Sequence, residues 1–168
     1  MAQLTGSKRV KTAVFISGTG SNLKSLIEFS KLKKSPISID IIVSDNIKSK
    51  GIKFSKIYKI KKKIIGFKNH ILAEKKILNE LKKNEINLIC LAGFMKILSS
   101  DFIKKFNGKI LNIHPSLLPK YKGLNTHERA IKNKDKYSGC TVHYVSTKLD
   151  SGKIISQKKV RIIKNDTP

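Results

Sequence analysis

Two polar side chains stand two residues apart in the segment LNIHPSLLP, residues 111–119. Alternate side chains leave the same face of an extended strand, so Asn112 and His114 lie together while Ile113 points the other way. Pro115 ends the strand and puts the pair at its carboxyl end, where open α/β sheets bind ligands. An imidazole moves protons near neutral pH, and an amide donates to a developing oxyanion. The pair predicts acid–base and oxyanion chemistry; a histidine that only satisfies a buried carbonyl is the alternative.

A glycine-containing turn, SGTGSNL at residues 17–23, joins an apolar segment to a helical pattern. Its glycines allow a sharp turn, and the helix start offers free N–H groups that suit a phosphate. The turn is not a Walker loop, because no Gly-Lys-Ser/Thr follows. Leu23 stands where a dinucleotide fingerprint has its third glycine, which weakens the case for nicotinamide binding. Asp45 stands roughly where a ribose-binding acid belongs, so nicotinamide binding stays an alternative. We predict a phosphate loop, with a helix capped by Ser21 or Asn22 as the structural alternative.

A third candidate is Asp150, in the loop TKLDSG at residues 147–152. A carboxylate beside a histidine holds its tautomer and favours its charged form, but an aspartate near a glycine is also an ordinary turn residue. His143 alternates with apolar neighbours in a strand and is expected to be structural, and His70 and His127 read as helix-start or surface residues. The His, Cys and carboxylate residues have no metal-ligand spacing, and the sequence has no G-x-S-x-G elbow, so we expect neither a metal nor a serine nucleophile.

The elements that carry these residues alternate between strands and helices. Apolar or alternating segments predict strands at residues 12–17, 37–44, 86–92, 110–114, 139–145 and 153–163. Helical spacing predicts helices at residues 23–30, 69–83, 99–106 and 126–134. Residues 47–68 stay ambiguous, with a possible short strand near Ile57. Because several strands are apolar throughout, we expect one α/β domain: a mostly parallel sheet with helices on both faces, over residues 11–168, after a flexible basic tail at 1–10.

The composition fits a globular chain of one domain, with 168 residues and a net charge of +25. The cations are 33 lysines and only three arginines (Arg9, Arg129 and Arg161). This argues for a generally cationic surface more than for a surface that recognises nucleic-acid bases. Lysine is dispersed and tryptophan is absent, so we expect no nucleic-acid partner despite the charge. No apolar run suits a signal peptide or membrane span, and Cys90 and Cys140 lie far apart, which favours a cytoplasmic protein.

Four motifs together resemble the folate-dependent formyltransferases. They are SGTGSNL, LAGFMKILS (91–99), LNIHPSLLPKYKG (111–123) and LDSG (149–152). HPSLLP with a later LDxG marks the whole group, and the SGxGSNL loop singles out the phosphoribosylglycinamide formyltransferases. The resemblance runs from about Lys11 to Pro168. It implies a Rossmann-like fold with one late antiparallel strand, and small-molecule substrates without nucleic acid, membrane or metal.

The resemblance also implies a reaction, in which the formyl group of 10-formyltetrahydrofolate moves to the amine of glycinamide ribonucleotide during purine synthesis. Asn112, His114 and Asp150 match the catalytic trio. The residues that match the loop for the nucleotide's phosphate are Gly20, Ser21, Asn22, Leu23 and Lys24. The residues that match the folate site are His70, Met95, Lys96, Ile97, Leu98, Asn112, Ser146, Thr147, Lys148, Leu149 and Asp150. A formyltetrahydrofolate deformylase, or a degenerate inactive relative, is the alternative.

The sequence departs from that family at a few positions. Lys96 stands where an arginine is common, His70 where we expect a basic folate contact, and Lys153 where proline usually follows Gly152. The segment Asn165–Pro168 has the residue types of a helix start. In the resembling family a helix follows at this point, so we expect a domain without that helix.

Overall fold

The structure is a computed structural model, and it describes residues 9–168. The described chain divides into two compact units. The first contains residues 9–96 and 106–109, and the second contains residues 97–105 and 110–168. The phosphate-loop candidates therefore belong to the first unit, and Asn112, His114 and Asp150 belong to the second.

Four parallel strands form the sheet of the first unit, in the order β3-β2-β1-β4. Their bounds are β1 Val10–Ile16, β2 Ile37–Ser44, β3 Lys61–Ile64 and β4 Leu88–Leu91. From Ala13 to Ile16 every side chain of β1 is fully buried. A strand buried on both faces needs apolar residues at every position, which is why the segment reads as a continuous apolar run.

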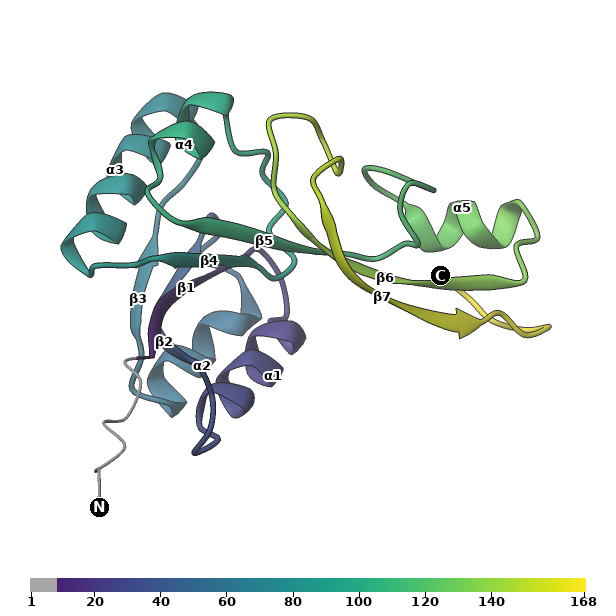
Figure 1. Cartoon of the computed structure of the whole chain (residues 1–168), viewed down its shortest axis with the longest axis horizontal. Coiled ribbons are helices and arrows are strands. Elements are labelled where there is room, and N and C mark those ends of the chain that lie inside the picture. The colour runs from purple at the N-terminus through teal and green to yellow at the C-terminus, as the bar shows by residue number, and fades with distance from the viewer. Residues whose placement is uncertain (1–8) are drawn as a thin grey trace, which may run out of the picture. The chain divides into compact units, whose positions relative to one another are not determined.

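Helices cover both faces of these strands (Figure 1). They are α1 Ser21–Ser30, the short 3₁₀ helix η1 Lys50–Ile52, α2 Lys53–Ile57 and α3 His70–Lys83. Leu23 and Ile27 of α1 pack with Phe54 of α2 against Val14 and Ile16. In Figure 1, α3 lies on the other face of the strands. This burial fixes the start of α1 at the carboxyl end of β1.

Two boundaries differ from the sequence expectations. Strand β1 begins at Val10, which we had placed in the tail, and Arg9 donates a hydrogen bond to the carbonyl of Ser30 at 2.9 Å. Residues 1–8 of the expected tail lie outside the described residues. The ambiguous segment contains α2, with Ile57 in the helix, and the strand follows at Lys61–Ile64. All four residues of β3 are exposed, so no apolar pattern marks this strand.

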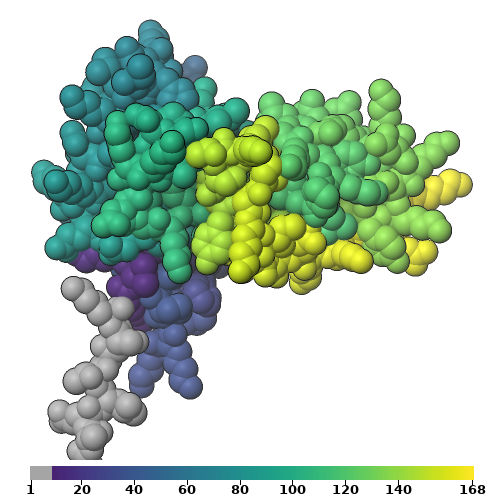
Figure 2. Space-filling view, turned by 45° about the horizontal axis from the view of Figure 1, so that its top comes forward, coloured from purple at the N-terminus to yellow at the C-terminus, as the bar shows by residue number. Residues whose placement is uncertain are grey.

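The second unit contains three antiparallel strands and two helices. Their bounds are α4 Ser100–Lys105, β5 Lys109–His114, α5 Thr126–Lys132, β6 Tyr137–Tyr144 and β7 Ile154–Arg161. Strand β6 runs opposite to both its neighbours, as the resemblance implies for one late strand. Every residue of β7 is exposed, and its yellow atoms lie at the surface in Figure 2.

The α/β class, the parallel strands and the helices on both faces of the first sheet are confirmed. No helix in the described part of the chain is both long and apolar enough to cross a membrane.

Candidate active site

Strand β5 puts Asn112 and His114 on one face, and β6 supplies the residues opposite them. Asn112 pairs with His143 and His114 pairs with Thr141 in the antiparallel register. The Nδ1 of His143 lies 2.8 Å from the carbonyl oxygen of Tyr144, and its Nε2 lies 3.2 Å from Nδ2 of Asn112. These partners assign the hydrogen of His143 to Nδ1, which leaves Nε2 to accept from the Asn112 amide. The amide nitrogen of Asn112 is thereby held with a second N–H hydrogen for another acceptor.

His114 is 4% exposed, and both its ring nitrogens face oxygen atoms. Its Nε2 lies 2.8 Å from the carbonyl oxygen of Tyr121, and its Nδ1 lies 3.4 Å from Oδ2 of Asp150. Two acceptors around one ring are satisfied together only when both nitrogens carry hydrogen. The surroundings of His114 therefore suit the imidazolium form, which can serve as a general acid.

Asp150 is held in place by a neighbouring loop and by the path of its own loop beside β6. Its Oδ2 also accepts the backbone N–H of Gly123 at 2.9 Å, and its Oδ1 lies 3.7 Å from Nε2 of His143. Two residues later, a Cβ on Gly152 would lie 1.7 Å from the carbonyl oxygen of Tyr144. Only glycine permits this approach, so the glycine of LDSG lets the loop return beside β6 with Asp150 at the histidines. The structure thus brings Asn112, His114 and Asp150 together.

The β1–α1 turn in the first unit has the features expected of a phosphate loop. Gly20 has a φ of 77° and precedes α1, whose first turn contains no acidic residue. Neither Ser21 nor Asn22 makes the capping hydrogen bond of the structural alternative, since α1 has no side-chain cap. The helix start therefore leaves N–H groups for a ligand. Leu23 is fully buried, so it offers its N–H and not its side chain, and Lys24 forms an ion pair with Glu28 at 3.6 Å.

The residues matched to a folate site divide between the units. Met95 is 65% exposed in the first unit, and its N–H donates to Oγ of Ser17 at 2.8 Å. His70 begins α3 and pairs with Glu74 at 3.0 Å. In the second unit, Ile97 is exposed and Leu98 is buried. Also in the second unit, residues 146–149 form a loop that contains the exposed side chain of Leu149.

Two further groups bear on alternative chemistries. Asp45, the candidate ribose-binding acid, lies 3.8 Å from the ammonium of Lys96, and its buried Oδ1 makes no hydrogen bond within the described structure. Burial raises the pKa of the Cys90 thiol to about 11, so this thiol is no nucleophile at neutral pH. Within residues 9–168, no three His, Cys, Asp or Glu residues gather as metal ligands would.

Sequence reasoning missed two partners of the trio, His143 and the carbonyl of Tyr121. His143 was expected to be structural, yet it contacts Asn112 and lies near Asp150. Alternation along β6 already put His143 and Thr141 on one face, and that signal was available. The register that sets His143 opposite Asn112 could not be read from the sequence, because it depends on the long connection between β5 and β6.

Comparison with known proteins identifies the family of this chain. A family model described as formyl transferase matches residues 10–168. The chain is 41% identical over 160 residues to the phosphoribosylglycinamide formyltransferase of Haemophilus influenzae, covering 94% of this chain and 76% of that protein. It is 42% identical over 163 residues to the human trifunctional purine biosynthetic protein adenosine-3, covering 95% of this chain. The chain spans only 16% of the length of that trifunctional relative.

Solved structures give the same result. The crystal structure of phosphoribosylglycinamide formyltransferase from Anaplasma phagocytophilum is 39% identical, with a TM-score of 0.89 over 95% of this chain and 76% of that one. The chain therefore belongs to the formyl transferase family. Within that family its relatives include phosphoribosylglycinamide formyltransferases, which confirms the resemblance and the fold class predicted from the motifs.

Proposed function

We propose that this chain transfers the formyl group of 10-formyltetrahydrofolate to the amine of N1-(5-phospho-D-ribosyl)glycinamide, a step of purine synthesis. The observation that carries the proposal is the cluster of Asn112, His114 and Asp150, in which a buried imidazole faces a carboxylate at 3.4 Å. The 41% identity to a protein named phosphoribosylglycinamide formyltransferase supports the nucleotide amine as the formyl acceptor, rather than water as in a deformylase.

In the proposed reaction, the folate supplies an activated formyl group. The amine nitrogen bonds to the formyl carbon, the bond from that carbon to the folate nitrogen breaks, and the amine's proton ends on the folate nitrogen. Asn112 donates its second amide hydrogen to the formyl oxygen as negative charge develops there. His114 gives a proton toward the leaving nitrogen, and Asp150 orients the ring and stabilises its charge.

The first unit binds the nucleotide in this proposal. The phosphate is held by the N–H groups at the start of α1, residues Ser21–Leu23, after the turn at Gly20. Lys24 adds positive charge one residue further on. The family resemblance assigns folate contacts to His70, Met95 and Lys96 of the first unit, and to Ile97, Leu98 and the loop Ser146–Asp150 of the second. The trio itself needs no metal for the steps assigned to it.

The test is an assay with purified chain, glycinamide ribonucleotide and a 10-formyl folate, followed by folate absorbance. His114→Ala should lower kcat by about 10²–10⁴-fold, the usual contribution of a general acid or base, with little change in the KM for the nucleotide. His127→Ala is the matched control, because His127 is an exposed residue of α5. Near-normal turnover of His114→Ala would reject the catalytic assignment.

The same assay separates the alternatives. Folate release without the nucleotide, together with formate production, identifies a deformylase. No turnover under either condition identifies an inactive relative. Dependence of folate release on the nucleotide amine supports the proposal.

We also propose that the partners are small molecules in a cytoplasmic setting. Both described cysteines, Cys90 and Cys140, are free thiols, which suits a reducing compartment. The charge of +25 is spread over lysines and does not require a nucleic-acid partner. A gel shift with an oligonucleotide that persists at physiological salt would contradict this part of the proposal.

A further inference from the structure

Tyr121 adopts a backbone conformation that is unusual for a tyrosine. Its φ is 55°, in the left-handed region that residues with a side chain rarely enter. This turn directs its carbonyl oxygen to Nε2 of His114 at 2.8 Å, across seven residues of loop. The left-handed backbone of Tyr121 therefore holds a hydrogen-bond acceptor at one ring nitrogen of the candidate catalytic histidine.

Resting on the function proposed above, we infer that Tyr121 is a positioning residue that selects the reactive nitrogen of His114. Its carbonyl accepts the Nε2–H hydrogen. The proton that His114 gives to the leaving folate nitrogen, and recovers from the amine, is therefore the one on Nδ1. The distances decide between the nitrogens: the Nε2 contact is 2.8 Å, and the Nδ1 contact with the carboxylate is 3.4 Å. The 2.8 Å contact has the length of an N–H···O hydrogen bond and the 3.4 Å contact is longer than that, so in the neutral ring we place the hydrogen on Nε2.

The side chain of Tyr121 is held by hydrogen bonds and by a cation–π contact. Its hydroxyl donates to Oδ2 of Asp135 at 2.9 Å, and the amide of Asn133 donates to that hydroxyl, also at 2.9 Å. The guanidinium carbon of Arg129 lies 5.0 Å from the centre of the ring. Asn133 and Asp135 follow α5 directly, so the end of this helix anchors the residue whose carbonyl reaches His114.

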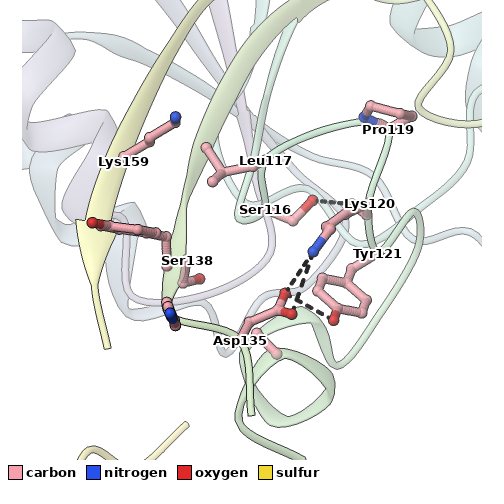
Figure 3. Close-up of a pocket in the computed structure, with 11 residues that line it drawn as sticks. Ser116, Leu117, Pro119, Lys120, Tyr121, Asp135, Ser138 and Lys159 are labelled. Carbon is pink, nitrogen blue, oxygen red and sulfur yellow. Dashed lines mark hydrogen bonds and ion pairs between the residues drawn. The ribbon is translucent and has the colours of Figure 1, made fainter. Parts of the chain in front are cut away.

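Figure 3 shows the anchor in the wall of a pocket of about 470 Å³ in the second unit. The ammonium of Lys120 reaches both carboxylate oxygens of Asp135, at 3.2 and 3.3 Å. Hydrogen bonds from Tyr121 and then Lys120 hold the pKa of the Asp135 carboxyl below its usual range. Ser116 also donates to the carbonyl of Lys120 at 2.6 Å, so the loop is fixed on both sides of the turn.

The anchor offsets the conformational cost of the left-handed tyrosine. Without it, the backbone would relax to negative φ and turn the carbonyl away from His114. The charged and titratable groups around this ring are Asp150 at Nδ1 and, behind that carboxylate, His143 at 3.7 Å from its Oδ1. Loss of the Tyr121 acceptor removes one of the two groups that suit the imidazolium.

The first test reads the tautomer directly. In protein labelled with 15N-histidine, long-range 1H–15N spectra distinguish a protonated ring nitrogen from a bare one. At a pH where the His114 ring is neutral, we expect hydrogen on Nε2 and a bare Nδ1. Hydrogen on Nδ1 would overturn the inference. This measurement needs no substrate, so its failure is distinct from a failure of the proposed formyl transfer.

The second test compares two variants that lose the same side-chain anchor. Tyr121→Gly tolerates positive φ, whereas Tyr121→Val resists it because a branched Cβ crowds the left-handed turn. We expect kcat to fall in the order wild type, Gly, Val, with Val about tenfold below Gly, because small misplacements of a reacting group are costly. The pH–rate profile of the Val variant should also differ from that of the Gly variant, while the KM values change less than kcat.

Lys59 provides the matched control, since its φ is also 55° and it lies in the first unit. Lys59→Gly and Lys59→Val report the general cost of the same substitutions on folding and should leave the pH profile unchanged. Tyr121→Phe removes both hydrogen bonds of the hydroxyl and keeps only the ring over Arg129, so its kcat should fall below that of the wild type. Equal kcat and identical pH profiles for the Gly and Val variants of Tyr121 would overturn the inference.

Discussion

At the scale of single residues, the candidate chemistry depends on which atoms face one another. Asn112, His114, His143 and Asp150 come from two strands and a loop, and they contact one another or nearby backbone carbonyls. His143 is saturated by Tyr144 and Asn112, so it orients the amide and has no hydrogen to give. His114 differs because its Nδ1 faces a carboxylate at 3.4 Å, longer than a strong hydrogen bond. That looser contact leaves Nδ1 as the nitrogen that can exchange a proton.

The substitution Asp150→Asn tests this arrangement. An amide cannot stabilise the imidazolium as a carboxylate does, so kcat should fall by about 10²-fold, the lower end of the usual contribution of acid–base catalysis. The measurement is kcat against pH at saturating concentrations of both substrates.

Ser151→Ala is a suitable control for that variant. Ser151 lies next to Asp150 and is exposed; its hydroxyl donates to the carbonyl of Leu149 and accepts from the ammonium of Lys122, and neither contact involves Asp150 or a histidine. It should keep the wild-type profile. If Asp150→Asn also keeps the height and shape of the profile, Asp150 is only a turn residue.

The sequence could predict part of this site. Asn112 and His114 follow from the two-residue period of a strand, because that period needs no knowledge of the partner strand. Asp150 alone reads as a turn residue, and only the resemblance assigned it a role. The carbonyl of Tyr121 carries no residue-type signal, since any residue has one. His143 needed the β5–β6 register, which is set by contacts between segments about thirty residues apart.

At the scale of elements, the start of α1 depends on how closely the β1–α1 turn approaches η1. A Cβ on Gly20 would lie 2.7 Å from the Cα of Gly51, and Gly20 has a φ of 77°. The N–H of Gly51 and the hydroxyl of Ser49 both donate to the carbonyl of Gly18, at 3.0 and 2.7 Å. The turn is therefore shaped by η1, an element that lies within the segment the sequence left ambiguous.

The pair Gly20→Ala and Gly18→Ala tests the role of this turn. Gly20→Ala combines a backbone clash with positive φ, so it should destabilise the protein by about 1–3 kcal/mol. It should also raise the KM for glycinamide ribonucleotide more than that for the folate. Gly18→Ala should be tolerated, because a Cβ there meets nothing within 4 Å. Thermal melting and the two KM values are the measurements, and equal effects on both substrates would mean that the turn serves the fold alone.

The predictability of the elements follows the strength of their apolar patterns. Strand β2 was predicted with its observed bounds, residues 37–44, because its apolar run ends abruptly in polar residues. Strand β3 was missed because KKKI, Lys61–Ile64, is exposed throughout and pairs only along β2. Lysines on an edge strand discourage pairing with other chains, and the same lysines remove the apolar pattern by which the strand could be predicted.

At the scale of the whole molecule, charge is the dominant feature. The chain has 36 Lys and Arg against 11 Asp and Glu, so at least 36 − 11 = 25 cations have no carboxylate of their own. Ion pairs such as Lys63–Glu80 and Lys105–Asp101 are local exceptions. Mutual repulsion of this size opposes the folded state, because folding brings like charges closer together than they are in the open chain.

Salt should therefore stabilise this protein. Raising NaCl from about 0.01 M to about 0.15 M shortens the Debye length from about 30 Å to about 8 Å and screens the repulsion. We expect Tm to rise over that range. A double variant, Lys62→Glu with Lys158→Glu, lowers the net charge by four, and its Tm should rise less, since both lysines are exposed on strands β3 and β7. A neutral osmolyte at matched osmolality controls for effects unrelated to charge. A Tm that is flat or falls with salt, or equal slopes for both proteins, would show that the excess lysines are too dispersed to weaken the fold.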